Sequence, residues 1–185
     1  MSNFKQNEIV KIDLVHAQIV NGLVLSQKPE NILELGFGGG RSCDAIISAI
    51  NYNKNNAKLT IVDNWIDWNG NMPEEVMPMY EKHAKIITMN EKDFIFSTKE
   101  KYEFIMSDAD HHHTNEWFEY VYDELLNENG ILVYHDINLI TEDFINLREI
   151  YTICKNRKLN HYLFNKSTLF YERCYRGLLV IFKNI

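Results

Sequence analysis

The sequence contains little cysteine and no long hydrophobic run. Its three cysteines, Cys43, Cys154 and Cys174, are an odd number without a C-x-x-C spacing, which argues against a disulfide framework and against a zinc cluster. The longest apolar run, Leu178 to Phe182, has the length of a strand and is far too short to span a membrane. The polar N-terminus lacks the hydrophobic region of a signal peptide. We therefore expect a cytoplasmic protein without a membrane partner.

Positive charge is also scarce. The net charge is −7 and no block of lysine and arginine stands out, so a surface that follows nucleic-acid phosphates is not expected. The length of 185 residues suits one domain with a sizeable core, and neither a repeat nor a linker interrupts it. We predict a single domain over residues 1–185, with a helical segment at 1–28 and a hairpin at 160–185. A homodimer stays open.

The feature around which the chain is organised is a short apolar strand followed by a glycine loop. The strand covers residues 32–35, four glycines fall within positions 36–40, and a helical pattern follows over 42–50. Glycines let the backbone N–H groups of such a loop approach the polar atoms of a ligand. The dinucleotide fingerprint G-x-G-x-x-G would place its third glycine at position 41, where this chain has Arg41.

Strand and helix patterns alternate along the chain. Strands are predicted at residues 32–35, 59–62, 84–89, 102–107, 131–134, 161–164 and 177–182, and helices at 8–27, 42–50, 73–83, 116–126 and 142–155. Alternation predicts a doubly wound, mostly parallel α/β sheet. The last two strands are too close for a crossover helix and should form an antiparallel hairpin. The prediction is a Rossmann-like sheet of seven strands with an antiparallel last strand.

Polar residues gather where these strands end, and ligands of open α/β sheets bind beyond the carboxyl ends of strands. The residues are Glu34, Asp63, Asp93, Asp108, His135 and Asp136. Asp63 ends the second strand, roughly 20 residues beyond the glycine loop, where a carboxylate accepts hydrogen bonds from ribose hydroxyls. That role suits NAD and S-adenosylmethionine (SAM) alike. A helix N-cap or a turn is the alternative role of Asp63.

The spacing Glu34-x-Gly36-x-Gly38-x-Gly40 resembles the first motif of class I SAM-dependent methyltransferases. Segments 102–111 and 125–137 resemble the metal-dependent small-molecule O-methyltransferases, both the catechol and caffeoyl-CoA types and the enzymes that methylate sugars of macrolide antibiotics. The resemblance covers roughly residues 30 to 137. It implies SAM as cofactor and a hydroxylated small molecule as methyl acceptor.

The resemblance also implies roles for individual residues. Asp93 and Phe94 would meet the adenine ring, and Asp108 would lie at the cofactor and bind a divalent metal. His111, three places later, would be the catalytic base, a role that its ordinary pKa suits. His135 and Asp136 would complete a site for Mg²⁺ or Mn²⁺, although the catechol type has an Asp-Asn pair where this chain has Asp136-Ile137. Without a metal, they would form either a hydrogen-bond network behind the site or a polar pair that binds substrate.

Three further features have more than one interpretation. His112 and His113 follow His111, but three consecutive side chains cannot point at one spot, so these two are expected to be exposed or capping. Trp65 and Trp68 either cover a ligand or close over an edge of the core, and Trp117 is a further aromatic that could line the acceptor site. His16 is expected to be a half-buried helix residue.

The predicted function is therefore O-methylation of a small hydroxylated acceptor with SAM as methyl donor. Two alternatives remain. One is a nucleoside-binding protein of the same fold that transfers no methyl group. The other is an NAD-dependent oxidoreductase, which Arg41 in place of the third glycine disfavours.

Overall fold

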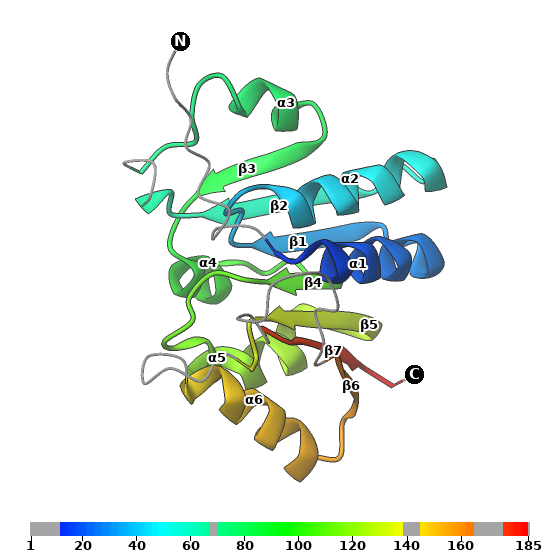
Figure 1. The fold of residues 1–185 in the computed structure, drawn as a ribbon, viewed down its shortest axis with the longest axis vertical. Helices are drawn as coiled ribbons and strands as arrows, with labels where there is room; N and C mark the ends of the chain where they lie inside the picture. The colour runs from blue at the N-terminus through cyan, green and yellow to red at the C-terminus, as the bar shows by residue number, and fades with distance from the viewer. Residues whose placement is uncertain (1–11, 67–69, 139–144, 165–175, 185) are drawn as a thin grey trace.

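The computed structural model describes residues 12–66, 70–138, 145–164 and 176–184. Seven strands form one sheet in the order β3-β2-β1-β4-β5-β7-β6 (Figure 1). The strands are β1 (Asn31–Leu35), β2 (Lys58–Asp63), β3 (Ala84–Thr88), β4 (Tyr102–Ser107), β5 (Leu126–His135), β6 (Asn160–Phe164) and β7 (Leu178–Phe182). Strands β1 to β5 run parallel, and β7 is antiparallel to both β5 and β6. The predicted fold class is confirmed.

Helices cover both faces of the sheet. They are α1 (Leu14–Gln27), α2 (Arg41–Asn53), α3 (Met77–Glu81), α4 (Glu91–Ser97), α5 (Thr114–Tyr120) and α6 (Ile145–Asn156). On one face, residues of α1, α2 and α3 share a hydrophobic cluster with alternate strand residues. On the other face, residues of α4 and α5 share a second cluster with Leu147, Ile150 and Cys154 of α6. In α2 the buried positions Cys43, Ile46 and Ala49 recur at helical spacing, which is why this segment forms an amphipathic helix. Within the described residues, every helix is too short or too polar to cross a bilayer.

The segment before β5 differs from the expected helix at 116–126. Helix α5 ends at Tyr120, and a π-helix, Val121–Leu125, leads directly into β5. The buried ammonium group of Lys183 donates hydrogen bonds of 3.0, 3.2 and 3.0 Å to the carbonyl oxygens of Tyr122, Asp123 and Leu126. These bonds satisfy carbonyls that a helix end leaves without partners. A residue about sixty positions away therefore helps to shape this turn.

Candidate active site

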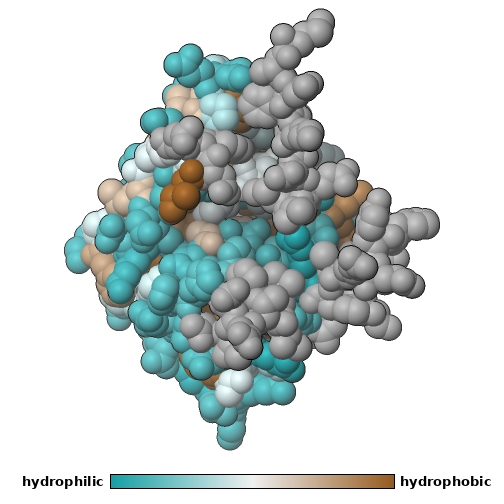
Figure 2. Space-filling model, turned by 60° about the vertical axis from the view of Figure 1, so that its left-hand side comes forward, coloured by the Kyte–Doolittle hydropathy of each residue, from teal (hydrophilic) through white to brown (hydrophobic). Residues whose placement is uncertain are grey.

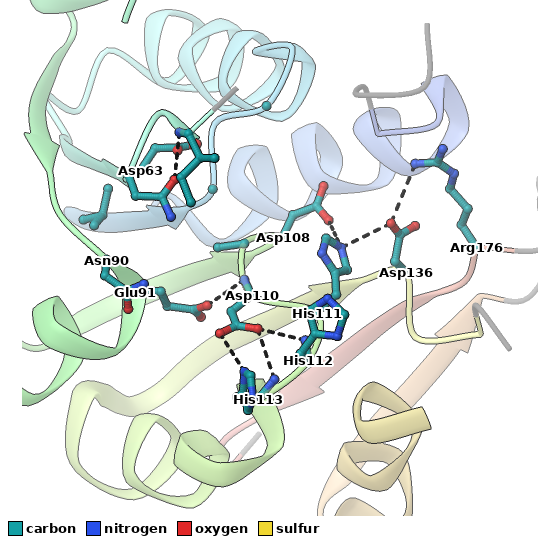
Figure 3. Close-up of a pocket in the computed structure, with 16 residues that line it drawn as sticks. Asp63, Asn90, Glu91, Asp108, Asp110, His111, His112, His113, Asp136 and Arg176 are labelled. Carbon is teal, nitrogen blue, oxygen red and sulfur yellow. Dashed lines mark hydrogen bonds and ion pairs between the residues drawn. The ribbon is translucent and has the colours of Figure 1, made fainter. Parts of the chain in front are cut away.

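A cavity of about 780 Å³ lies beyond the carboxyl ends of β1, β2, β4 and β5. This edge of the sheet faces the viewer in Figure 2, where hydrophilic residues dominate its centre. The described residues that line the cavity are Gly36, Gly38, Val62, Asp63, Asn64, Ile66, Asn90, Glu91, Asp108, Ala109, Asp110, His111, His112, His113, Asp136 and Arg176 (Figure 3). Its volume and its convergent polar groups are typical of a small-molecule site.

The glycine loop forms one wall of this cavity. Gly36 has a φ of 85°, and a Cβ atom there would overlap the carbonyl group of Asp108 on the neighbouring strand. Only glycine tolerates both the dihedral angle and the close approach. Gly38 also lines the cavity, whereas Gly40 lies behind it, where a Cβ atom would come within 2.7 Å of the Tyr80 hydroxyl. The structure therefore brings Gly36 and Gly38, but not Gly40, to the cavity.

Asp63 lies at the tip of β2 and faces the cavity. Its Oδ2 accepts a hydrogen bond of 2.7 Å from the backbone N–H of Phe37, and its Oδ1 accepts one of 2.7 Å from the N–H of Trp65. The carboxylate thus ties the glycine loop to the loop after β2. Each carboxylate oxygen can accept a further bond, so the geometry is compatible with the predicted ribose contact.

Trp65 does not line the cavity. Its backbone adopts a φ of 58°, and its ring is 2% exposed, 5.4 Å from the ring of Phe37. The indole N–H donates to the hydroxyl of Thr88 at 3.0 Å. Of the two interpretations, Trp65 therefore closes over an edge of the core. Trp117 is likewise buried in the core, and Trp68 lies outside the described residues.

Three other predicted cofactor residues, Glu34, Asp93 and Phe94, also lie away from the cavity. Glu34 is fully buried in β1, where the Ser42 hydroxyl donates to Oε1. Burial raises the pKa of Glu34 to about 8 although the Ser42 hydrogen bond lowers it, so this carboxyl group is largely protonated at neutral pH. Asp93 is exposed in the first turn of α4. Its neighbour Phe94 is 6% exposed and belongs to the core.

Asn90 and Glu91 occupy the place on the cavity where Asp93 and Phe94 were expected. Strand β3 ends at Thr88 and α4 begins at Glu91, so the residues at this junction face the cavity. The Asn90 side chain accepts from the N–H of Lys92 as the N-cap of α4. Sequence reasoning missed Asn90, although an asparagine at a helix start is an N-cap signal that could have found it. The family resemblance placed Asp93 and Phe94 at the adenine ring, and neither residue lines this cavity, because the connection from β3 to α4 is only two residues long.

Glu91 holds the loop after β4 in position. It is 5% exposed, and its Oε2 accepts a hydrogen bond of 2.9 Å from the backbone N–H of Asp110. Its Oε1 accepts from the Ser107 hydroxyl at 3.2 Å. Burial raises the pKa of Glu91 to about 7, against the lowering effect of these hydrogen bonds. Sequence reasoning missed Glu91.

Asp108, His111, His135 and Asp136 form a compact group, here called the carboxylate–histidine centre. The His111 Nε2 atom lies 3.2 Å from Oδ1 of Asp108 and 3.3 Å from Oδ2 of Asp136 (Figure 3). On the other side, Nδ1 of His135 lies 3.3 Å from Oδ1 of Asp108 and 3.1 Å from Oδ1 of Asp136. All four residues had been predicted from the sequence, and the fold brings them together.

The charges of the centre determine its protonation. Burial disfavours a charged His111, but hydrogen bonds and charge attraction from Asp108 and Asp136 outweigh it and raise the pKa of His111 to about 10. Burial would raise the pKa of Asp108, but His135 and His111 hold it well below the usual range. His111 is therefore an imidazolium between two carboxylates at neutral pH. Asp136 has a φ of 59°, a left-handed conformation whose cost is typical of functional sites.

Arg176 is a further member of the cavity wall that sequence reasoning missed. It immediately precedes Gly177 at the start of the final strand, and its Nη1 lies 3.7 Å from Oδ2 of Asp136. The backbone N–H of Asn138 donates to the Arg176 carbonyl at 2.8 Å. This contact brings Arg176 beside the end of β5. No local sequence signal marked it, because a single arginine between the last two strands has no distinctive spacing.

His112 and His113 lie on the rim of the cavity and are exposed, as expected. Oδ1 of Asp110 accepts hydrogen bonds of 2.8 and 3.1 Å from their backbone N–H groups. The His113 ring contacts the same carboxylate at 3.2 Å. Asp110 therefore fixes the turn that returns His111 to the cavity.

His16 departs from its expected half-buried position. The side chain is fully buried, and its ring meets the ring of His135 edge-on at a centroid distance of 5.3 Å. Burial and the neighbouring His135 lower the pKa of His16 to about 4, against the attraction of nearby aspartates. The imidazole of His16 is therefore neutral at pH 7.

Donor atoms of Asp108, His135 and Asp136 all lie within 4.8 Å of one another. Two carboxylates and an imidazole at this separation fit a divalent cation such as Mn²⁺ or Mg²⁺. One oxygen of the set, Oδ1 of Asp136, is buried and accepts no hydrogen bond within the described part of the chain, although Nδ1 of His135 lies 3.1 Å away. The predicted metal residues are thus compatible with the ion, although His111 contacts the same carboxylates.

Solved structures share this fold. The O-methyltransferase of Bacillus cereus in complex with SAH (S-adenosylhomocysteine) aligns with a TM-score of 0.71 and 14% identity over 94% of this chain and 83% of that chain. TomG of Streptomyces achromogenes, an O-methyltransferase of tomaymycin synthesis in complex with SAM, aligns with a TM-score of 0.74 and 12% identity over 94% and 82%. The SAH-bound methyltransferase PaMTH1 of Podospora anserina gives 0.70 and 14% over 94% and 80%.

A comparison with protein families identifies the family of the chain. A search of curated proteins found no significant match. A family model described as a methyltransferase domain matches residues 33–137, which include the glycine loop and the carboxylate–histidine centre. Because this match covers more than half of the sequence, the chain belongs to this methyltransferase domain family.

Proposed function

We propose that the chain is a SAM-dependent O-methyltransferase that methylates a hydroxyl group of a small acceptor. The observation that carries this proposal is one continuous cavity with a nucleoside-type half and an acid–base half. Gly36, Gly38 and Asp63 line the first half, and Asp108, His111 and Asp136 line the second. The SAH and SAM complexes of proteins with the same fold support the choice of cofactor.

The first half has the features that a nucleoside needs. Asp63 offers carboxylate lone pairs to ribose hydroxyls, and its bonds to Phe37 and Trp65 hold it in place. Asn90 and Glu91 lie on the adjoining wall. We therefore assign the ribose to Asp63 and place the adenine beside Asn90 and Glu91, instead of Asp93 and Phe94.

The second half has the features that a hydroxyl acceptor needs. SAM supplies an electrophilic methyl group on a sulfonium that leaves as a neutral thioether. The chain has to hold the acceptor oxygen in line with that methyl group and to remove the hydroxyl proton. A carbon–oxygen bond forms, the carbon–sulfur bond breaks, and His111 Nε2 receives the proton. This step requires a neutral His111, so His111 must first give up its proton or its carboxylate contacts.

A divalent cation would help to meet this requirement. Asp108, His135 and Asp136 would hold it, and bound there it would lower the pKa of the acceptor hydroxyl. The ion would neutralise the same two carboxylates that the His111 imidazolium contacts, so the two would compete for them. With these charges neutralised, the attraction that raises the pKa of His111 would weaken, and the ring could accept a proton.

The paired His111 also favours a second candidate. A protein that binds SAM without transferring its methyl group would keep His111 as a fixed imidazolium between Asp108 and Asp136.

A cytoplasmic location, a homodimer and the lack of nucleic-acid or membrane partners stay predictions from the sequence.

Thermal unfolding in the presence of SAM, SAH or NAD tests the cofactor assignment first. At a hundredfold excess over Kd, a bound ligand stabilises the fold by about 2.7 kcal/mol. Stabilisation by SAM and SAH but not by NAD supports the proposal, and the reverse contradicts it. Mass spectrometry of reactions with catechols, hydroxycinnamoyl thioesters and sugars then detects acceptor methylation together with SAH. SAM binding without any transfer across this panel would favour the second candidate.

A further inference from the structure

A group of unpartnered polar atoms lies on the α1 side of the carboxylate–histidine centre. Both ring nitrogens of His16, Nε2 of His135 and Oδ2 of Asp13 are buried and have no hydrogen-bond partner among the residues that the structure describes. His16 is 0% exposed and His135 1%. Burying a polar group without a partner costs free energy, so three such residues at one place point to a ligand that satisfies them.

The fold aims these side chains at one point. Asp13 and His16 are separated by three positions at the start of α1, so they project from the same face of the helix. Along β5, Ile131 and Val133 face the cluster that contains α1, and alternation places His135 on that face too. The guanidinium of Arg41 donates to the carbonyl of Ile12 at 2.6 Å and fixes the chain just before Asp13.

Asp13 is the N-cap residue of α1, yet its side chain makes no capping hydrogen bond. N-cap aspartates normally accept from a backbone N–H of the first turn. Here Oδ2 of Asp13 instead lies 3.6 Å from Nδ1 of His16. The carboxylate is therefore directed toward the imidazole at the expense of the cap.

We propose that Asp13, His16 and His135 bind a divalent transition-metal ion. This site is distinct from the Mg²⁺ or Mn²⁺ site described above at Asp108 and Asp136. Donor atoms of the three residues lie within 4.8 Å of one another. In a tetrahedral site with bonds of about 2.0 Å, donor atoms lie roughly 3.3 Å apart, close to the 3.6 Å between Asp13 and His16. Two imidazoles and one carboxylate select Zn²⁺, Co²⁺ or a similar ion over Mg²⁺.

His135 serves both sites through different nitrogens. Its Nδ1 contacts Asp108 and Asp136, and its Nε2 is left for the new ion. The ion would join the start of α1 to the end of β5. It would thereby fix the orientation of the His135 ring within the carboxylate–histidine centre. This role is independent of methyl transfer, and metal binding can be measured without SAM or an acceptor.

Cobalt titration of the metal-free protein tests the proposal. Co²⁺ bound by imidazole and carboxylate in a four- or five-coordinate site absorbs visible light far more strongly than hydrated Co²⁺. We expect one equivalent to bind with this absorption, and Zn²⁺ but not Mg²⁺ to displace it. His16→Gln and Asp13→Asn should each lower the affinity at least about 100-fold, since even residues behind the direct ligands contribute 10–100-fold.

Two variants provide the comparison. His83→Gln removes a histidine that is exposed in the turn before β3 and should leave cobalt binding unchanged. Asp108→Asn alters the neighbouring site and should weaken binding less than Asp13→Asn. Asp13 is 22% exposed at a helix start, so Asp13→Asn decides the question if His16→Gln does not fold by circular dichroism. The proposal is overturned if the wild type binds no cobalt, if Asp13→Asn binds normally, or if Asp108→Asn weakens binding as much or more.

Discussion

His111 Nε2 lies 3.2 Å from Oδ1 of Asp108, the residue three positions earlier at the end of β4. The backbone turn that allows this contact is fixed by Asp110, whose carboxylate accepts from the N–H groups of His112 and His113. His111 is thereby returned to the cavity while its neighbours stay on the rim. The contact explains why one histidine of the run lies between two carboxylates and the other two do not.

We predict that His111→Ala lowers turnover by about 10²–10⁴-fold, the usual cost of losing a general base, with SAM affinity nearly unchanged. His112→Ala is the matched control and should stay within a few-fold of the wild type, because its side chain is exposed. Calorimetry measures SAM affinity, and SAH release measures turnover once an acceptor is found. Equal activity of the two variants would remove His111 from the proposed role.

The pairing of His111 also predicts how stability depends on pH. The pKa of His111 is raised from 6.5 to about 10 in the fold, so its stabilising contribution is fully present below pH 6.5 and is lost as the pH rises through 10. The low pKa of Asp108 adds stability that is lost only in acid, below its ordinary value of 3.8. Urea unfolding of metal-free protein should therefore show a smaller loss between pH 6.5 and 10 for His111→Gln than for the wild type. Parallel curves would contradict the paired imidazolium.

Metal removal separates two accounts of Asp108 and Asp136. If these carboxylates hold a cation during catalysis, EDTA should abolish methyl transfer, and Mg²⁺ or Mn²⁺ should restore it. Restoration by either ion should fail in Asp108→Asn. Full activity after exhaustive chelation would mean that the two aspartates bind His111 and the acceptor but hold no catalytic cation.

Asp63→Ala should weaken SAM binding about ten- to a hundredfold, because charge-assisted hydrogen bonds contribute about 1.5–3 kcal/mol. The same substitution also removes the acceptor for the N–H groups of Phe37 and Trp65, so a modest loss of stability is expected. Asp63→Asn keeps one amide oxygen and should lie between the alanine variant and the wild type. Unchanged affinity in a folded Asp63→Ala protein, measured by calorimetry, would refute the ribose assignment.

The sequence by itself determined the sheet and its ligand-binding edge. Apolar runs of strand length, the glycines at 36–40 and the short spacing of the last two strands are local signals, because each depends on backbone geometry within a few residues. Residues that end strands could also be placed correctly. Parallel strands bring their carboxyl ends to one edge, so Asp108, His135 and Asp136 were expected to lie close together, and the family resemblance added His111; the four residues do meet.

Only the tertiary structure decided which of the remaining candidates reach the cavity. Trp65 points into the core because Asp63 binds its backbone N–H and Thr88 accepts from its indole. Glu34 is buried and hydrogen-bonded to the Ser42 hydroxyl. The meeting of His16 with His135 could not be predicted either. It depends on the packing of α1 against the sheet, and a helical pattern states which face is buried but not what that face contacts.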